Sequence, residues 1–248
     1  MNNEHDLTPQ VSIIIPAHNE EESIESTVVE LNGVLRKTSL KSEIIIIDDG
    51  SNDDTPTILQ NLKMKFNHLD SIKLNKNMGQ SAALGAGFER ATGEFIVTMD
   101  ADGQNDPEDI PRLLKEMNHC DVCCGIREKR HDPLTKKLSS KFANYVRNKV
   151  LRQDIVDTGC SLKVFKSGLI KDIRSWNGFH RFLPALSLIR GAVVKQIPVN
   201  HRPRLNGKSK YGNLNRFPAV LVDLFGVWWM KKRNVVLKQE GYLDNDNL

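Results

Sequence analysis

The sequence has no apolar run long enough to span a lipid bilayer. A transmembrane helix needs about 20 consecutive apolar residues, whereas the most apolar stretch, 217–230, covers 14 residues and includes Asp223. The first ten residues carry Glu4 and Asp6 and lack the basic start and apolar core of a secretory signal peptide. We therefore expect a cytoplasmic protein that meets a membrane only at its surface.

Cysteine is scarce, and its spacing does not build a metal centre. The chain has four cysteines, of which Cys120 and Cys123 form a C-x-x-C pair. A zinc site needs a second such pair or suitably spaced histidines, and neither follows here. The local sequence CDVCCGIR instead predicts a short buried strand, in which the cysteines are small apolar core residues.

Acidic residues are nearly absent from the second half of the chain. Residues 127–233 contain six Asp or Glu against 24 Lys or Arg, whereas residues 1–126 contain 22 acidic and 10 basic residues. So strong a basic balance predicts phosphate, nucleic acid or anionic lipid as a partner. The plainer alternative is that many of these Lys and Arg side chains simply lie on solvent-exposed faces of helices.

Up to residue 126 the chain alternates regularly between apolar runs and amphipathic segments. Continuous apolar runs are typical of strands buried on both faces of a sheet. Their alternation with helices predicts an α/β fold, a doubly wound and mostly parallel sheet with helices on both faces. The expected strands are 11–16, 44–47, 71–74, 94–99 and 121–126, and the expected helices follow an Asn19 cap and cover 55–66, 80–91 and 107–117.

Beyond residue 127 the alternation is less regular, and the predicted elements are shorter or more basic. We expect no internal repeat and no low-complexity tract there. The expected order is a basic loop and helix in 131–152, a strand at 157–165, a helix at 178–189, a strand at 192–199, a basic loop at 201–211 and a helix at 214–230.

Polar segments follow three of the predicted strands, at 16–20, 48–51 and 100–104. The carboxyl ends of parallel strands lie at one edge of a sheet, where such folds bind ligands. We therefore expect the three segments to converge. The segment Asp48-Asp49-Gly50-Ser51 can accept hydrogen bonds from a ribose or a base, or it can simply form a turn and a helix cap.

The segment Asp100-Ala101-Asp102 predicts a metal site for a diphosphate. Carboxylates suit Mg²⁺ or Mn²⁺, and such a cation neutralises the charge that develops on a diphosphate leaving group. On an extended segment Asp102 and Gln104 would share one face and both point at the metal. Asp100 would then face the donor, the molecule that carries the diphosphate. The alternative is a chance D-x-D in a loop.

Four segments together resemble the family 2 glycosyltransferases. They are VSIIIPAHNEEESI, EIIIIDDGSNDDT, NMGQSAALGAGFERATGEFIVTMDADGQNDPEDI and GKSKYG. Within that family the chain is most similar to the polyprenyl-phosphate group, the dolichyl-phosphate mannose synthase-like enzymes. The resemblance runs from Val11 to Gly212. It implies a GT-A fold and an inverting transfer of a sugar from a nucleotide-sugar donor.

The resemblance also implies roles for the residues at matching positions. Asp100, Ala101 and Asp102 would hold the donor and a Mg²⁺ or Mn²⁺ ion, with Gln104 as second metal ligand. Arg127 matches a phosphate-contacting arginine, and Arg204 and Lys210 match the basic pair of a late loop that closes over the phosphates. The residues implied to contact the nucleoside of a GDP- or UDP-sugar are Pro16, His18, Glu20, Ile47 and Asp49.

The charge distribution favours a phosphate as the acceptor. A sugar hydroxyl normally needs a carboxylate base, whereas a phosphate monoester has a second pKa of about 6 and is already a nucleophile at neutral pH. The basic half therefore favours a polyprenyl phosphate, as the resemblance implies. Transfer to a saccharide hydroxyl by a soluble enzyme remains the alternative, with Asp157 either a base or part of a turn.

The end of the chain predicts contact with a membrane surface. Trp228-Trp229 followed by Lys231-Lys232-Arg233 is an aromatic and basic pattern suited to a membrane interface, although an ordinary packed helix would also fit. The expected organisation is a disordered tail at 1–10, a GT-A domain at 11–212, an amphipathic helix at 213–233 and a polar tail at 234–248.

Two rival classes fit the sequence less well. A dinucleotide-binding oxidoreductase would need a Gly-rich turn after the first strand, and PAHNE stands there instead. A nucleic-acid-binding or non-catalytic nucleotide-binding protein would account for the basic half but not for the acidic strand ends, so we expect no nucleic-acid partner. The sequence does not specify the oligomeric state.

Overall fold

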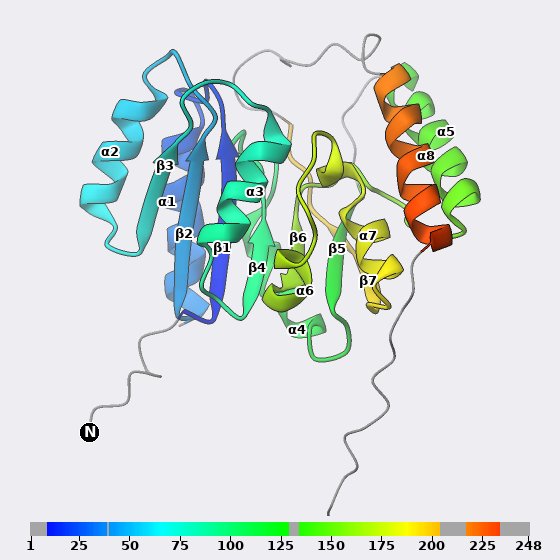
Figure 1. Ribbon diagram of the computed structural model, residues 1–248. Helices are drawn as coiled ribbons and strands as arrows, with labels where there is room; N and C mark the ends of the chain where they lie inside the picture. The colour runs from blue at the N-terminus through cyan, green and yellow to red at the C-terminus, as the bar shows by residue number, and fades with distance from the viewer. Residues whose placement is uncertain (1–8, 39, 129–133, 204–216, 234–248) are drawn as a thin grey trace, which may run out of the picture.

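The described residues form a seven-stranded mixed sheet with helices on both faces (Figure 1). This computed structural model describes residues 9–38, 40–128, 134–203 and 217–233. The strand order is β3-β2-β1-β4-β6-β5-β7. The strands are β1 (Val11–Ala17), β2 (Ser42–Asp48), β3 (Leu69–Lys73), β4 (Phe95–Thr98), β5 (Val122–Arg127), β6 (Lys163–Lys166) and β7 (Val194–Val199).

Neighbouring strands pair in parallel everywhere except at β6. That strand runs antiparallel to both β4 and β5, so that Lys163 at its start lies opposite Thr98 and Cys124. The other pairs, β1 with β2 and β4, β2 with β3, and β5 with β7, are parallel. The predicted α/β fold with a mostly parallel sheet is confirmed.

Successive residues of the central strands serve opposite faces of the sheet. In β1, Ile13 and Ile15 belong to the core on the side of α1, α2 and α4, whereas Ile14 belongs to the core on the side of α3, α6 and α7. Each fully buried isoleucine contributes about 1.5–3 kcal/mol. The helices are α1 (Ile24–Thr38), α2 (Thr55–Lys65), α3 (Gln80–Arg90), α4 (Ile110–Glu116), α5 (Leu134–Leu151), α6 (Ser167–Lys171), α7 (Leu183–Ile189) and α8 (Phe217–Arg233), with 3₁₀ turns η2 (Pro107–Asp109) and η3 (Phe179–Arg181).

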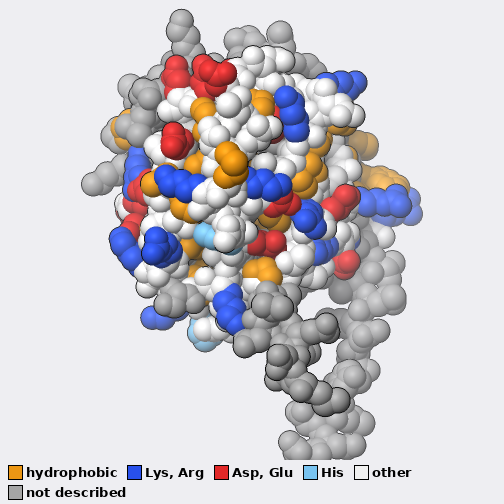
Figure 2. Space-filling view, turned by 90° about the vertical axis from the view of Figure 1, so that its left-hand side faces the viewer, with side chains coloured by type: hydrophobic (Ala, Val, Ile, Leu, Met, Phe, Trp, Pro, Cys, Tyr) orange, Lys and Arg blue, Asp and Glu red, His pale blue; other side chains and the backbone are white. Residues whose placement is uncertain are grey.

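The β3 edge of the sheet is protected by charge. Asp70 on β3 pairs with Lys63 of α2 at 2.7 Å and with Arg90 of α3 at 3.3 Å. Figure 2 shows acidic and basic side chains interspersed over this face of the molecule. Charged side chains at an edge strand disfavour pairing with another chain.

The helix that follows β1 does not begin where the sequence predicts. The cap assigned to Asn19 is wrong, because α1 begins at Ile24 and Asn19 adopts a positive φ of 53°. Its side-chain Oδ1 accepts a hydrogen bond from the backbone N–H of Asn52 at 2.8 Å. Asparagine tolerates both a cap and a left-handed turn, and here a contact with a distant turn decides between them.

The strand expected at 157–165 is shorter in the structure. β6 spans Lys163–Lys166, and the residues before it form a turn. Asp157 lies in that turn, where its carboxylate accepts hydrogen bonds from the backbone of Gly159 and from Arg127. The backbone N–H of Gly159 in this turn therefore donates to the Asp157 side chain and not to a neighbouring strand.

The four cysteines are buried, as the sequence predicts for a core strand. Cys123 and Cys124 follow one another on β5 and belong to the cores on opposite faces of the sheet. Burial raises the pKa of each of these two thiols to about 12. At neutral pH they are small apolar side chains rather than thiolates.

The C-terminal helix α8 packs against the domain along one stripe. Leu224 is 8% exposed and Val227 is fully buried, and α8 lies beside α5 at one end of the sheet (Figure 1). Among the described residues, no helix is both long enough and apolar enough to cross a membrane.

Candidate active site

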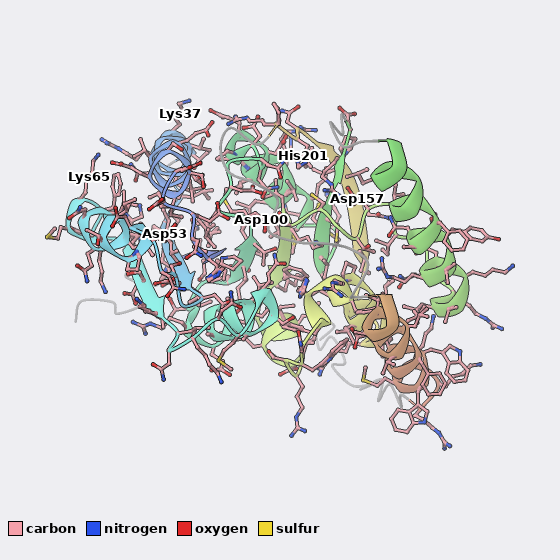
Figure 3. All side chains as sticks on the ribbon, turned by 90° about the horizontal axis from the view of Figure 1, so that it is seen from above. Lys37, Asp53, Lys65, Asp100, Asp157 and His201 are labelled. Carbon is pink, nitrogen blue, oxygen red and sulfur yellow. The ribbon has the colours of Figure 1, made fainter. Side chains whose placement is uncertain are left out.

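The polar turns after β1 and β2 are joined directly to each other. Asn19 donates its backbone N–H to Ser51 Oγ at 2.9 Å, and Glu20 donates its backbone N–H to Thr55 Oγ1 at 2.8 Å. The turn after β4 ends at the same edge, because β4 runs parallel to β1. Seen from above, Asp100 lies centrally between Asp53 on one side and Asp157 on the other (Figure 3).

The residues expected to contact a nucleoside line this edge to different depths. Pro16, the penultimate residue of β1, lies opposite Ile47 of β2, whose side chain is fully buried in the core. His18 and Glu20 are half-buried, and the Glu20 carboxylate accepts a hydrogen bond from Ser23 Oγ at 2.9 Å. Of these residues, Ile47 is buried at this edge, whereas His18 and Glu20 are partly exposed there.

Asp49 fixes the start of α3. Its two carboxylate oxygens accept the backbone N–H groups of Met78 at 2.7 Å and Gly79 at 2.8 Å. Asp48 accepts the backbone N–H of Ser51 at 2.8 Å. Both aspartates therefore have turn-forming contacts, and Asp49 also links β2 to the segment that leads into Gln80.

The Asp100-Ala101-Asp102 segment is a tight turn and not the extended strand end that the sequence suggested. Asp102 accepts the backbone N–H of Gln104 at 3.1 Å, and Gly103 has a φ of +71° that suits glycine. The side-chain amide nitrogen of Gln104 donates to the Arg202 carbonyl at 3.2 Å. Asp102 and Gln104 are therefore joined by a hydrogen bond that closes the turn, and not by the side-chain alternation of a strand.

Asp100 is held by contacts from two other segments. Gln80 at the start of α3 donates its side-chain amide to Asp100 Oδ1 at 3.1 Å. Asn105 accepts the backbone N–H of Asp100 at 2.8 Å and the hydroxyl of Ser161 at 2.8 Å. The carboxylate thus has a fixed direction, set mainly by residues outside the D-x-D segment.

The electrostatics of this turn fit a divalent cation. The pKa of Asp100 is raised to about 6, first by burial and second by the neighbouring Asp102 carboxylate, while a hydrogen bond from Ser161 and the charges of Lys163 and Arg127 act in the opposite direction. A divalent cation would supply counter-charge to both carboxylates. Asp102 and the amide oxygen of Gln104 are hard oxygen donors of the kind that Mg²⁺ and Mn²⁺ take.

The described residues contain no group of three His, Cys, Asp or Glu that could enclose a metal ion. A cation that is held by one or two protein oxygens together with the phosphates of a substrate, the usual arrangement for Mg²⁺, does not need such a group.

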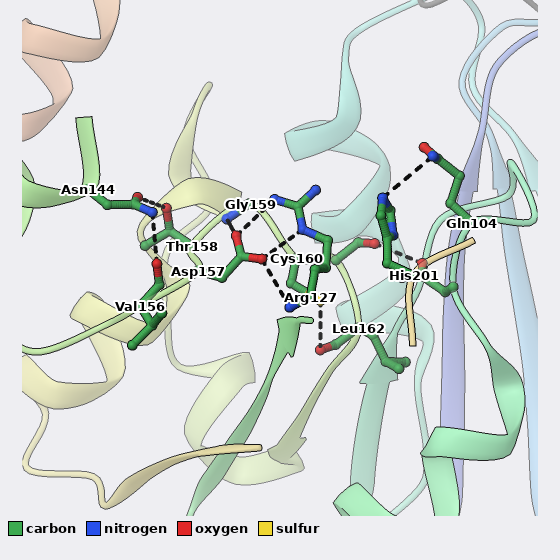
Figure 4. Close-up of polar contacts among 12 residues, drawn as sticks. Gln104, Arg127, Asn144, Val156, Asp157, Thr158, Gly159, Cys160, Leu162 and His201 are labelled. Carbon is green, nitrogen blue, oxygen red and sulfur yellow. Dashed lines mark hydrogen bonds and ion pairs between the residues drawn. The ribbon is translucent and has the colours of Figure 1, made fainter. Parts of the chain in front are cut away.

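Arg127 is locked into a bidentate ion pair with Asp157 (Figure 4). Its Nε donates to Asp157 Oδ2 at 2.7 Å and its Nη2 donates to Oδ1 at 2.8 Å. A Cβ at Gly159 would lie 2.9 Å from Arg127 Nη2, so a larger residue there would push the guanidinium from its present position. The sequence left Asp157 open as a base or part of a turn, and these contacts favour the turn.

The late loop begins beside the Asp100–Gln104 turn. Arg202 forms ion pairs with Glu30 and Asp106, each at 2.8 Å, and its backbone N–H donates to the Gln104 carbonyl at 2.9 Å. His201 pairs with Asn105 in an isolated antiparallel bridge. Arg204 and Lys210 lie outside the described residues.

Sequence reasoning missed several residues of this site. Gln80 and Asn105 form hydrogen bonds with Asp100, and Ser161 donates to Asn105. Lys163 is buried, donates to the Cys160 carbonyl and acts on Asp100 through its charge, and Arg202 fixes the start of the late loop. Asn105 and Lys163 have partners only five and three residues away. Gln80 and Arg202 contact residues 20 and 172 positions away, which no local pattern reports.

Comparison with known proteins identifies the family. The model of glycosyl transferase family 2 matches residues 12–174. The chain belongs to this family. It is a glycosyltransferase, as the sequence predicted, and its sheet has the GT-A architecture of its structural neighbours.

The chain also resembles two relatives in sequence and one solved structure in fold. The chain is 34% identical to dodecaprenyl-phosphate galacturonate synthase of Rhizobium johnstonii, over 90% of this chain and 68% of that protein. It is 35% identical to undecaprenyl-phosphate 4-deoxy-4-formamido-L-arabinose transferase of Salmonella choleraesuis, over 87% and 66%. It thus spans about two thirds of the length of these relatives.

The solved structure is glucosyl-3-phosphoglycerate synthase of Mycobacterium tuberculosis with Mn²⁺, UDP and phosphoglyceric acid. The TM-score is 0.65 at 16% identity, covering 90% of this chain and 78% of that one. At this identity the likeness shows the fold alone.

Proposed function

We propose that the protein transfers a sugar from a nucleotide-diphosphate sugar to a polyprenyl phosphate, with Mg²⁺ or Mn²⁺ at the donor diphosphate. The observation that carries the proposal is the shared edge of the sheet. There, the charge of Arg127 acts on Asp100, and the direction of that arginine is set by its ion pair with both oxygens of Asp157. The relatives named for dodecaprenyl- and undecaprenyl-phosphate transfer support the acceptor class.

On the donor side, the Asp100–Gln104 turn would hold the diphosphate. When bound, the cation neutralises the charge that develops on the leaving diphosphate. Asp102 and Gln104 would ligate it, and Asp100, aligned by Gln80 and Asn105, would face the sugar and its phosphates. Ala101 is 3% exposed, and its carbonyl accepts the Thr27 hydroxyl at 3.2 Å, which fixes the floor of this turn.

The nucleoside would lie over the turns after β1 and β2. Pro16, His18, Glu20, Ile47 and Asp49 are the residues proposed to shape or contact it. The two Asp49 oxygens accept backbone groups of the 78–79 segment, so Asp49 would act mainly by shaping the pocket. GDP and UDP are both candidates for the base.

On the acceptor side, a phosphate oxygen would attack the anomeric carbon. A bond forms between that oxygen and C1, the bond from C1 to the donor diphosphate breaks, and the configuration at C1 inverts. A phosphate dianion carries no proton that must be removed, so no general base is needed. Arg127, together with Arg204 and Lys210 of the late loop, would reduce the repulsion between acceptor and donor phosphates.

A transfer assay tests this function. The protein would be incubated with Mn²⁺, labelled UDP- or GDP-sugars, and either undecaprenyl phosphate or oligosaccharides. We expect label in the lipid fraction, lost with Asp102→Asn and kept with the control Asp172→Asn, whose side chain is 72% exposed. Label only on the oligosaccharide would refute the lipid phosphate acceptor, and full activity in EDTA would refute the metal.

We further propose peripheral contact with the cytoplasmic face of a membrane, made by α5 and α8. Large apolar side chains are exposed on both helices, and Phe225 stacks on Trp228 with ring centres 5.6 Å apart. Lys231, Lys232 and Arg233 are exposed at the end of α8. Among the described side chains, the exposed large apolar residues are Phe142, Tyr145 and Val150 on α5 and Leu221, Val222, Phe225 and Trp229 on α8.

Liposome sedimentation tests this contact. Each basic residue near an anionic surface adds about 1 kcal/mol, so binding should be strongest on anionic vesicles and weaken with salt. Phe225→Ser and Trp229→Ser should reduce it, whereas Met64→Ser on α2, at a residue 77% exposed, should not. Equal binding of all variants, or none to anionic vesicles at low salt, would contradict the contact.

A further inference from the structure

Two asparagines of α5 hold the turn that precedes β6. Asn144 donates its side-chain amide to the Val156 carbonyl at 2.9 Å and accepts the Thr158 hydroxyl at 2.9 Å (Figure 4). One turn further along α5, Asn148 donates to the Ile155 carbonyl at 3.0 Å and accepts its backbone N–H at 3.3 Å. Both asparagines of α5 thus contact residues 155–158.

Arg147 reinforces the same contact from a buried position. It is 7% exposed, its Nη1 donates to Asn144 Oδ1 at 2.9 Å and to the Thr158 hydroxyl, and its guanidinium carbon lies 5.3 Å from the centre of the Phe182 ring. Burying a cation is costly unless it is hydrogen-bonded. These hydrogen bonds offset part of that cost, and together with the Phe182 contact they tie α5 to both the turn and the start of α7.

The turn in question carries the carboxylate that orients Arg127. Asn144 contacts Val156 and Thr158, the two residues that flank Asp157. Asp157 in turn accepts two hydrogen bonds from the Arg127 side chain and one from its backbone N–H, at 3.3 Å. The ion pair uses Nε and Nη2, so its geometry decides the direction in which the rest of the planar guanidinium points.

We propose that Asn144 and Arg147 are positioning residues for Arg127. They act through the Asp157 turn, which they hold at the distance and angle that the Arg127 ion pair requires. The inference rests on the proposed role of Arg127 at the acceptor or donor phosphate. A misplacement of about 1 Å can reduce a rate about 100-fold, so loosening this turn affects catalysis without removing any group that touches substrate.

The test uses single and double variants in the transfer assay, with a short water-soluble prenyl phosphate as acceptor so that membrane binding plays no part. Asn144→Ala should lower kcat/KM for the acceptor roughly 10- to 100-fold. Binding of the nucleotide diphosphate with Mn²⁺ should be unchanged, because the donor turn is held by other residues. Lys149→Ala, on the same helix but exposed and outside these contacts, is the matched control.

Two further variants separate positioning from general loss of structure. Arg147→Lys should retain more activity than Arg147→Met, because an ammonium can still donate to Asn144 and Thr158. If neither Arg147 variant folds, Asn144→Ala decides alone, because Asn144 is only half-buried. An equal fall in nucleotide binding and in acceptor kcat/KM would mean that α5 only stabilises the domain.

The decisive measurement is the double variant Arg127→Ala with Asn144→Ala. If Asn144 acts through Arg127, its loss has no further effect once Arg127 is gone. Losses that multiply would overturn the positioning role and leave the proposed function standing. Full activity of Arg127→Ala alone would overturn both the proposed role of Arg127 and this inference.

Discussion

Replacing Asp157 with asparagine separates a scaffold carboxylate from a catalytic base. The substitution Asp157→Asn keeps the size of the side chain and one oxygen acceptor, which can still receive the Gly159 N–H. It removes the negative charge that faces Arg127. The side chains of Asp157 and Arg127 are only 6% and 14% exposed, so water cannot replace the lost charge.

The expected loss of stability follows from that burial. Removing one partner of a buried ion pair typically costs about 3–5 kcal/mol, because it leaves an uncompensated charge. The asparagine retains part of the hydrogen bonding, so we expect about 3 kcal/mol, the lower end of that range. For a domain of this size such a loss lowers Tm by roughly 6–12 °C.

Thermal unfolding by circular dichroism measures this loss, and a second variant checks its cause. Arg127→Met combined with Asp157→Asn should be at least as stable as Asp157→Asn alone, because it removes the unpaired guanidinium. Loss of a general base would instead reduce kcat about 10²- to 10⁴-fold with little change in Tm. The scaffold role would be refuted by an Asp157→Asn protein that loses kcat to this extent but keeps its Tm within about 2 °C of wild type, well short of the expected fall in Tm.

Three other outcomes follow from the structure. Asp102→Ala should abolish transfer and the stabilisation of the protein by a nucleotide diphosphate with Mn²⁺, as measured by thermal shift; an unchanged shift would place the metal elsewhere. Lys210→Ala should reduce turnover far more than Tm if the late loop acts at the phosphates, and equal activity would show that it does not. The four cysteines should react with a thiol reagent at pH 8 only after unfolding, because all four are buried and burial raises the pKa of each thiol. For Cys123 and Cys124, with a pKa of about 12, only about one part in 10⁴ is ionised at that pH; rapid labelling of the native protein would contradict their burial.

The central strands and the position of the site could be predicted from the sequence. Ile44–Ile47 and the apolar run of β1 are continuous because both faces of the strands are covered, and this pattern is local. The polar turns at their ends follow from the same pattern. Their meeting at one edge needs only the parallel arrangement of β1, β2 and β4.

The contacts that orient the site could not be predicted in the same way. Arg127 and Asp157 are 30 residues apart, and Arg202 and Glu30 are 172 apart, so no local pattern reports them. Asn19 was misassigned because its partner, Asn52, belongs to another strand end. The five-residue helix α6 escaped prediction because it is little more than one turn long and shows no periodicity.

The reversed direction of β6 determines how charge is distributed across the sheet. Because β6 lies antiparallel between β4 and β5, the segment that enters it meets the segments that leave its neighbours. The charge of Lys163 therefore acts on Asp100, and Asp157 forms an ion pair with Arg127. A sheet with every strand parallel would have placed Lys163 at the opposite end. One inverted strand thus brings residues from the acidic half and the basic half of the chain to the same edge of the sheet. At that edge a doubly anionic donor and an anionic acceptor could be neutralised together.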